Sequence, residues 1–282
     1  LPAQDLVEYW PNDLASGARR WIAQNIENGR LHQGNFILNL KPEDWQADHL
    51  SNDHFSLNFK FEDLVAHVLR PMPPIMGGRG EGTLSARDLR LSIKGGAADG
   101  VPVKGSQVHL YDLDQPGPQM ASIALKVDAP LRDILRLIDY QPLGYTTAFG
   151  LEADRLQGDG ALVAQLDFPL VKELSLDDVG IEVKARVEKL LIPDLFAQKP
   201  LEEGALDLYV DRDGLRASGT ARLGEADLDI IWQEDFTAAK GALSSDFTIT
   251  SSFNREILAD LFFDPAPYFS GTGKADIILE GS

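Results

Sequence analysis

Cysteine is absent from the 282-residue chain. Disulfide bonds, thiol nucleophiles and cysteine-ligated metals are therefore excluded, and nothing indicates the redox compartment. No run of 18 apolar residues occurs, so no segment is suited to cross a membrane as a helix. The chain also lacks an initiator methionine and a signal-like start. We interpret it as a fragment of a longer protein whose anchor would lie outside these residues.

Positive charge is scarce. The chain has 26 Lys and Arg against 44 Asp and Glu, a formal net charge of −18. An acidic surface repels phosphate backbones and anionic headgroups, so we predict that nucleic acid is not a partner and that the protein does not adhere generally to a membrane face. A hydrophobic fraction of 44% is sufficient for a folded core.

Catalytic and metal-binding patterns are missing as well. The five histidines form no i,i+4 pair, and the glycine-rich segment 77–82 follows prolines and precedes a strand-like run, which predicts a turn and not a phosphate loop. The acidic residues Asp112, Asp114 and Asp177–Asp178 lie beside turn residues. We therefore predict no enzymatic activity, no metal site and no cofactor. The alternative is a hydrolase that uses carboxylates such as Asp112 and Asp114.

A loose repeat organises what is present. An apolar segment followed by prolines and then glycine begins near residues 62, 130, 193 and 253, after an N-terminal helix and strand segment at 1–61. We expect short helices at 61–69, 130–138 and 254–262, with a degenerate copy at 192–196. Repeated units stack on their neighbours, so the sequence predicts one elongated, repeat-built region over 1–282. The other interpretation is an ordinary antiparallel domain with hairpin and helix excursions.

The clearest helix is predicted near 12–28, from the start signal Pro11–Asp13 to a stop at Asn28–Gly29. Most of the remaining sequence alternates apolar and polar residues, which is typical of antiparallel strands with one wet face. Asp211–Gly214 between two such runs predicts a tight hairpin turn. The fold class is therefore mainly β with short α: a twisted, curved antiparallel sheet.

Something must cover or occupy the apolar face of this sheet. A second sheet would make a sandwich, and short helices could cover only part of the face. The third option is a hydrophobic groove that holds apolar ligand. The candidate groove residues are those that alternate most regularly with charged neighbours: Ile181, Val183, Val187, Leu206, Leu208, Leu228, Ile230, Trp232, Phe247 and Ile249.

Several short motifs, in order, resemble the YhdP-like branch of the AsmA-like envelope proteins of Gram-negative bacteria. They are Tyr9–Pro11 with Gly17–Ile22 and Gly34–Leu40, then Asp128–Leu131 with Pro142–Leu143, Gly158–Gly160 with Leu166–Leu170, and Val210–Gly219. The resemblance covers most of the chain.

The resemblance implies a function. It suggests a segment of a periplasmic, bridge-like lipid transfer protein that shields phospholipid acyl chains in a β-groove between the inner and outer membranes. The expected partners are phospholipid acyl chains and the remainder of the same polypeptide, including an inner-membrane anchor. The alternative is a non-transporting envelope scaffold or assembly module with a closed β core.

Overall fold

The computed structural model describes residues 1–9, 16–41, 51–68, 70–115, 117–141, 143–148, 151–171, 178–196, 198–238, 244–261, 266, 268 and 271–281. The chain separates into two compact units. Unit 1 comprises Leu1–Val127, Tyr140–Leu143 and Ala164–Ile181, and unit 2 comprises Asp128–Asp139, Gly144–Val163 and Glu182–Ser282.

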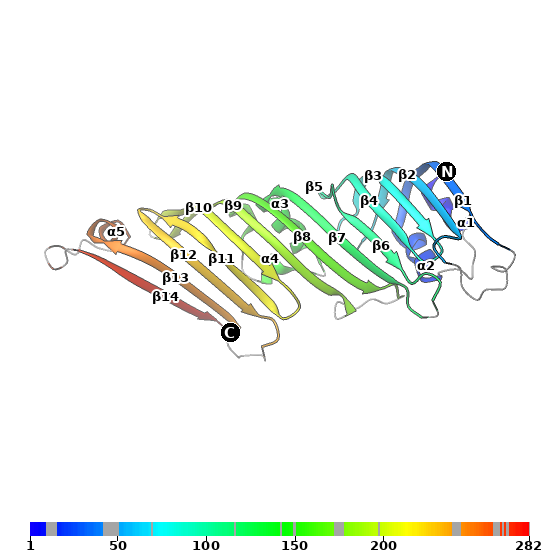
Figure 1. Cartoon of the computed structure of the whole chain (residues 1–282). Coiled ribbons are helices and arrows are strands. Elements are labelled where there is room, and N and C mark those ends of the chain that lie inside the picture. The colour runs from blue at the N-terminus through cyan, green and yellow to red at the C-terminus, as the bar shows by residue number, and fades with distance from the viewer. Residues whose placement is uncertain are drawn as a thin grey trace. The chain divides into compact units, whose positions relative to one another are not determined.

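Strands dominate both units and belong to one open antiparallel sheet whose strand order follows the chain, except that β5 pairs only with β4 (Figure 1). Their bounds are β1 (Ile26–Leu38), β2 (Phe55–Ala66), β3 (Ile75–Ser85), β4 (Leu89–Ala98), β5 (Val101–Pro102), β6 (Gln107–Tyr111), β7 (Met120–Pro130), β8 (Gln157–Pro169), β9 (Gly180–Phe196), β10 (Lys199–Val210), β11 (Gly214–Leu223), β12 (Ala226–Asp235), β13 (Ser245–Asn254) and β14 (Thr272–Gly281). The mainly β antiparallel prediction is confirmed.

The helices are short. They are η1 (Ala3–Asp5), α1 (Leu6–Tyr9), α2 (Ser16–Asn25), α3 (Leu131–Asp139), α4 (Tyr145–Ala148), η3 (Ala153–Arg155) and α5 (Arg255–Leu261). Helices α3 and α5 confirm two of the helices expected from the repeat. Each follows directly on a strand, β7 and β13 respectively.

The other two expected repeat helices are wrong. Phe61 to Ala66 continues β2, where Phe61 pairs with Gly80, and Ile192–Phe196 continues β9, where Ile192 pairs with Leu201. Backbone hydrogen bonding to neighbouring strands overrides the local helical pattern at both places. Asp63 and Asp194 take left-handed φ values of 54° and 51° within these strands, which is incompatible with a continuous helix.

The N-terminal helix ends earlier than predicted. Its expected start at Pro11–Asp13 lies outside the described residues, and α2 ends at Asn25, where the side-chain Nδ2 donates to the carbonyl of Trp21 over 2.9 Å. Asn28 already pairs with Val65 in the sheet. The expected helix stop at Asn28–Gly29 is therefore wrong, and Gly29, at φ 136°, lies at an irregularity of strand β1 instead.

The glycine-rich segment 77–82 forms strand and not the predicted turn. It lies within β3, between β2 and β4. A Cβ atom at Gly80 would come within 2.7 Å of the ring of Phe61, and one at Gly82 within 2.8 Å of a methyl of Leu91. The glycines therefore make room for neighbouring side chains to lie across the strand, which sequence-local turn statistics do not capture.

Bulges cluster in unit 2 where β8, β9 and β10 run side by side. Gly158, Lys189 and Glu203 have φ values of 138°, 53° and 54°. Gly158 contacts the backbone of Lys189, and Leu190 pairs with Gly204, so the three lie at neighbouring positions. An extra residue in a strand bends it and increases its twist, so this row of bulges curves the sheet.

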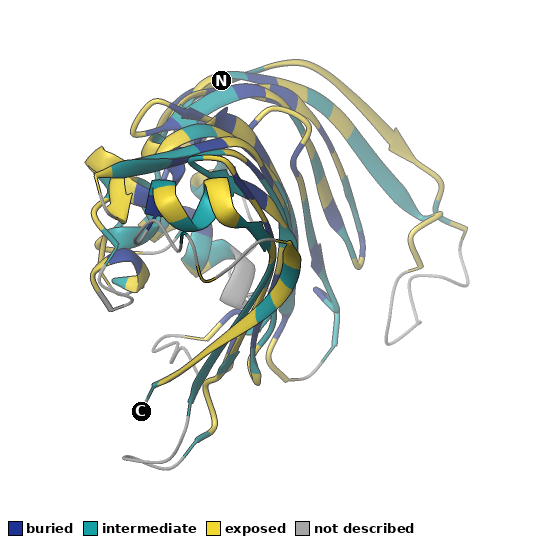
Figure 2. Cartoon of the chain, turned by 90° about the vertical axis from the view of Figure 1, so that its left-hand side faces the viewer, coloured by how far each residue is buried: buried dark blue, intermediate teal, exposed yellow. Residues whose placement is uncertain are grey.

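Each unit has its own apolar core. Helix α2 contributes Ile22 to the core of unit 1, together with Leu110 and Phe168. In unit 2, Leu131 and Leu135 of α3 and Leu261 of α5 pack with strand residues. Figure 2 shows how burial varies along each strand.

Candidate functional site

Nine of the ten predicted groove residues lie in unit 2, on one face of β9–β13. Residues directly opposite each other in an antiparallel pair share a face. Val187 lies opposite Leu206, Ile230 opposite Ile249, and Trp232 opposite Phe247. The tenth, Ile181, belongs to unit 1 and packs against that unit's core. We call the face that carries the nine residues the inner face of unit 2.

Two cross-strand rows make up most of the inner face. One row runs from β9 to β14 through Val187, Leu206, Gly219, Ile230, Ile249 and Ile277. The neighbouring row runs through Ala185, Leu208, Ala217, Trp232, Phe247 and Leu279. Every side chain in both rows is apolar apart from the glycine, so the inner face is a continuous apolar surface.

Helices α3 and α5 cover one end of this face. Leu131 and Leu135 of α3 and Leu261 of α5 form one cluster with the strand residues Val187, Leu190, Leu201, Ala221, Ala226 and Leu228. Val187 and Leu228 retain only 8% and 9% of their accessible surface. The covered end is therefore an ordinary packed core.

Coverage falls away towards β14. In the first row Val187 is buried, Ile230 and Ile249 are half-buried, and Ile277 is 47% exposed. In the second row Trp232 and Phe247 are half-buried and Leu279 is 55% exposed. A large apolar surface open to solvent on a folded protein marks a binding site more often than a defect. The inner face next to β14 is such a surface, with Ile277 and Leu279 exposed on it.

A stacked aromatic pair lies in this half-buried region. The rings of Trp232 and Phe247 have centroids 5.0 Å apart and planes inclined by 13°. The pair presents rigid, polarisable area that loses little conformational entropy when it contacts a ligand.

The opposite face of the same strands is charged. Arg186 forms an ion pair with Asp207 at 2.8 Å, and Lys184 pairs with Glu182 at 2.7 Å. The hydrogen bond from Lys184 to Glu182 raises the pKa of the lysine. This face is therefore the solvent-exposed side of the sheet.

Unit 1 also has an apolar cross-strand row, but its exposure is greatest at the N-terminal strand β1 instead of at the C-terminal strand. A row runs through Phe36, Leu57, Leu84, Leu89, Leu110 and Ala121. Exposure falls from 59% at Phe36 to 6% at Leu89 and 1% at Ala121. This part of the chain also alternates apolar and polar residues, but none of the row's residues was among the predicted groove residues. Ile277 and Leu279 were not among them either, because the run Ile277–Leu279 is uniformly apolar and hides the period of two.

The acidic residues singled out from the sequence serve local structure. Asp112 has a left-handed φ of 58°, and the largely buried carboxylate of Asp114 accepts from Nε of Arg87 over 3.0 Å. Asp177 lies outside the described residues. Asp112 thus takes part in a turn through its backbone, where its carbonyl accepts from the N–H of Gln115, and the carboxylate of Asp114 forms an ion pair.

The histidines are spread over separate elements. His32 lies in β1, His109 in β6, and His67 pairs with Glu27 at 2.7 Å. The ring of His54 accepts from the backbone of Ser51 over 3.1 Å, and His49 is outside the described residues. Within the residues that the structure describes, no group of three His, Asp or Glu side chains could hold a metal ion.

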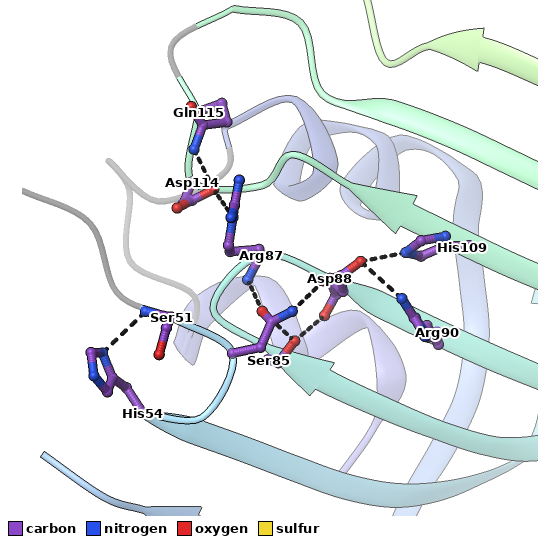
Figure 3. A network of polar contacts seen from close by, with 10 residues as sticks. Ser51, His54, Ser85, Arg87, Asp88, Arg90, His109, Asp114 and Gln115 are labelled. Atoms are coloured by element: carbon purple, nitrogen blue, oxygen red, sulfur yellow. Dashed lines mark hydrogen bonds and ion pairs between the residues drawn. The ribbon is translucent and has the colours of Figure 1, made fainter.

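A polar network joins the β3–β4 turn to β6 and to the turn at 51–54 (Figure 3). Asp88 contacts Nε2 of His109, and it accepts from Nδ2 of Asn52 over 2.6 Å and from Arg90 over 3.4 Å. Partial burial of Asp88 raises its pKa, but the hydrogen bonds from His109 and Asn52 outweigh it, and the net shift is downward. The network ties three segments together.

No described helix is long and apolar enough to cross a membrane. Comparison with known proteins identifies one family: the family model described as YhdP protein matches residues 2–217, well over half of the chain. The chain belongs to that family, as the ordered motifs suggested. A search of curated proteins found no match, and a search of solved structures found none.

Proposed function

We propose that this member of the YhdP family is a segment of a periplasmic, bridge-like lipid transfer protein of the Gram-negative envelope. In this proposal phospholipid acyl chains lie on the uncovered part of the inner face, and the remainder of the polypeptide supplies an inner-membrane anchor. The family is associated with the cell envelope, which supports the location. The predicted residues Val183, Leu206, Leu208, Ile230, Trp232, Phe247 and Ile249 would contact the chains.

The observation that carries the proposal is the gradient of exposure along the inner face, from Val187 at 8% to Ile277 at 47%. Burial of apolar surface contributes about 25 cal/mol per Å². An acyl chain laid over half-exposed Ile230, Phe247 and Leu279 removes its own surface and theirs from water together. The headgroup can stay in solvent at the edge of the face.

Native mass spectrometry of gently purified protein tests the proposal. Reproducible phospholipid adducts support it, provided that they diminish when Ile249→Asp places a charge on the inner face. The matched control is Thr248→Asp, because Thr248 precedes Ile249 in β13 and points to the opposite face. Absence of adducts after incubation with phospholipid vesicles would refute lipid binding by this segment.

A closed scaffold or assembly module is the second candidate, and one observation favours it. Helices α3 and α5 already cover the end of the inner face around Val187 and Leu228. If protein covered the rest in the same way, the face would be a core and no lipid would bind. Lipid adducts therefore separate the two candidates directly.

We also propose that the segment has no catalytic activity. A hydrolase acting on envelope polymers would use Asp112 or Asp114, yet Asp114 is engaged with Arg87. A turnover screen on glycan and lipid substrates tests this. Activity that disappears in Asp112→Asn or Asp114→Asn, with the fold retained, would establish the hydrolase instead.

A further inference from the structure

One carboxylate lies on the inner face itself. Glu234 follows Trp232 by two residues in β12, so both side chains point to the same face. Its Oε1 accepts from the indole Nε1 of Trp232 over 2.7 Å and from Oγ of Ser245 over 2.5 Å. The two donors fix the carboxylate beside the stacked rings of Trp232 and Phe247.

Glu234 marks the boundary between the apolar face and water. On one side of it, along the strand, lie Trp232 and Ile230, and on the other side the strand ends at Asp235. Opposite Glu234 are Leu215 of β11 and Ser245 of β13, so at this level the inner face changes from apolar to polar at β12. An ionised carboxylate has about four acceptor positions, and two are used here.

The surrounding rim is acidic. Among the described residues, the strand ends at this level carry more carboxylates than cations. The carboxylates are Glu182, Asp211, Asp213, Glu234, Asp235, Asp246 and Glu280, and the cations are Lys184, Arg212 and Arg216. Hydrogen bonds from the hydroxyl and backbone N–H of Thr237 lower the pKa of Asp235, which keeps it ionised. The rim therefore attracts cations and repels anions.

We propose that the inner face selects amphiphiles whose headgroup carries an ammonium group, with that group on the carboxylate of Glu234 and the acyl chains over Trp232, Phe247 and Ile249. The inference rests on the proposed lipid binding and specifies its substrate class. An ammonium donates to the carboxylate and is attracted to the faces of the aromatic rings. A phosphatidylethanolamine headgroup meets both conditions, whereas an anionic phosphatidylglycerol headgroup has no cation to offer and is repelled by the rim.

Trp232 is a positioning residue in this scheme. Its indole N–H holds Glu234 on the inner face, and its ring provides one wall of the ammonium site. Trp232→Phe keeps an aromatic ring and removes the hydrogen bond. We expect this variant to bind lipid with a reduced headgroup preference.

A competition experiment tests the proposal. The protein is incubated with vesicles of equimolar phosphatidylethanolamine and phosphatidylglycerol of identical acyl composition, repurified, and its bound lipid is quantified by mass spectrometry. We expect phosphatidylethanolamine to be enriched by up to about fivefold, the ratio for an exposed ion pair at the upper end of its usual strength, about 1 kcal/mol. Glu234→Gln keeps an acceptor for Trp232 and Ser245 but removes the charge, and it should lower the ratio towards one.

The control is Asp246→Asn, which removes one charge from the same rim but from the opposite face, where Asp246 lies opposite Gln233. It should keep the enrichment. N-acetylated phosphatidylethanolamine, which has lost its cation, should compete no better than phosphatidylglycerol. Equal binding of both headgroups, or equal effects of Glu234→Gln and Asp246→Asn, would overturn the ammonium site while leaving acyl-chain binding intact. If the repurified protein carries neither lipid, the proposed function is overturned as well.

Discussion

Trp232 in β12 lies directly opposite Phe247 in β13, and their rings stack at 5.0 Å. The pair lies on the inner face of unit 2 between the end that α3 and α5 cover and the strand ends that meet water. It therefore belongs to the part of the face where packing against protein stops and contact with a ligand can begin.

The two ends of the inner face should respond differently to a buried charge. Val187→Asp places a carboxylate in the cluster under α3 and α5, and we expect it to lower the free energy of unfolding by roughly 3 kcal/mol or more. Val183 lies four residues away on the same face and is half-buried. We expect Val183→Asp to lower the free energy of unfolding by less than about 1.5 kcal/mol. Chemical denaturation measures both.

Lys184→Asp is the control for this pair, because Lys184 points to the charged face. It should change the free energy of unfolding by no more than about 0.5 kcal/mol. Equal and large losses in Val183→Asp and Val187→Asp would mean that the whole inner face is a closed core.

Asp88 should stabilise the protein in a pH-dependent way. Its pKa is lowered from 3.8 in the folded state, so its stabilisation is present above that value and is lost as the pH falls through the folded pKa. At pH 7 we expect Asp88→Asn to lower the free energy of unfolding by about 1 kcal/mol. Thermal melts should show the gap between wild type and variant closing as the pH falls below about 4.

The neighbouring exposed Asp53 provides the comparison for Asp88. Asp53→Asn should melt like the wild type at pH 7, because this side chain is exposed. If Asp88→Asn also tracks the wild type at pH 7, the network of Figure 3 contributes nothing to stability.

Gly80 should not tolerate a side chain. A Cβ there meets the backbone carbonyl of Ser92 and the ring of Phe61, neither of which can withdraw without disturbing β4 or the β2–β3 pair. We expect Gly80→Ala to lower the free energy of unfolding by about 1–3 kcal/mol. Gly34→Ala, where the nearest atom is 3.8 Å from the added carbon, is the matched control and should be nearly neutral. Similar denaturation midpoints for the two variants would contradict the close packing of β3.

Strand β14 should drive self-association. Within the described residues it pairs only with β13, and it exposes Ile277, Ile278 and Leu279 by 47%, 60% and 55%. Open apolar edges template further strand pairing. Sedimentation velocity should show oligomers that grow with concentration, and Ile278→Lys should suppress them.

Ile231→Lys controls for hydrophobicity alone. Ile231 lies on the same face of the sheet as Ile278, opposite the inner face, and is 48% exposed. It belongs to β12, however, which is paired with a strand on both sides. It should leave the oligomers in place. If both lysine variants disperse them equally, the association is a surface effect and not an edge effect.

The sequence by itself determined which side chains share a face. Because successive side chains point to opposite sides of a strand, the strict alternation in Ile181–Glu188 puts its apolar residues on one face. The register of β9–β13 then places nine of the ten predicted groove residues on the same face. The Asp211–Gly214 hairpin was equally local: the N–H of Asp211 donates to the carbonyl of Gly214 over 3.0 Å, and Oδ1 of Asp211 accepts from the N–H groups of Asp213 and Gly214.

Only the tertiary structure decided which part of that face is covered. The burial of Val187 depends on Leu135 and Leu261, which are 52 residues before and 74 residues after it in the chain. The strand state of the glycines in β3 likewise depends on Phe61 and Ser92, and one hydrogen bond of Glu234 depends on Ser245 in the neighbouring strand. A short-range pattern fixes the direction of a side chain, whereas its exposure and its partners are set by segments that meet it only when the chain folds.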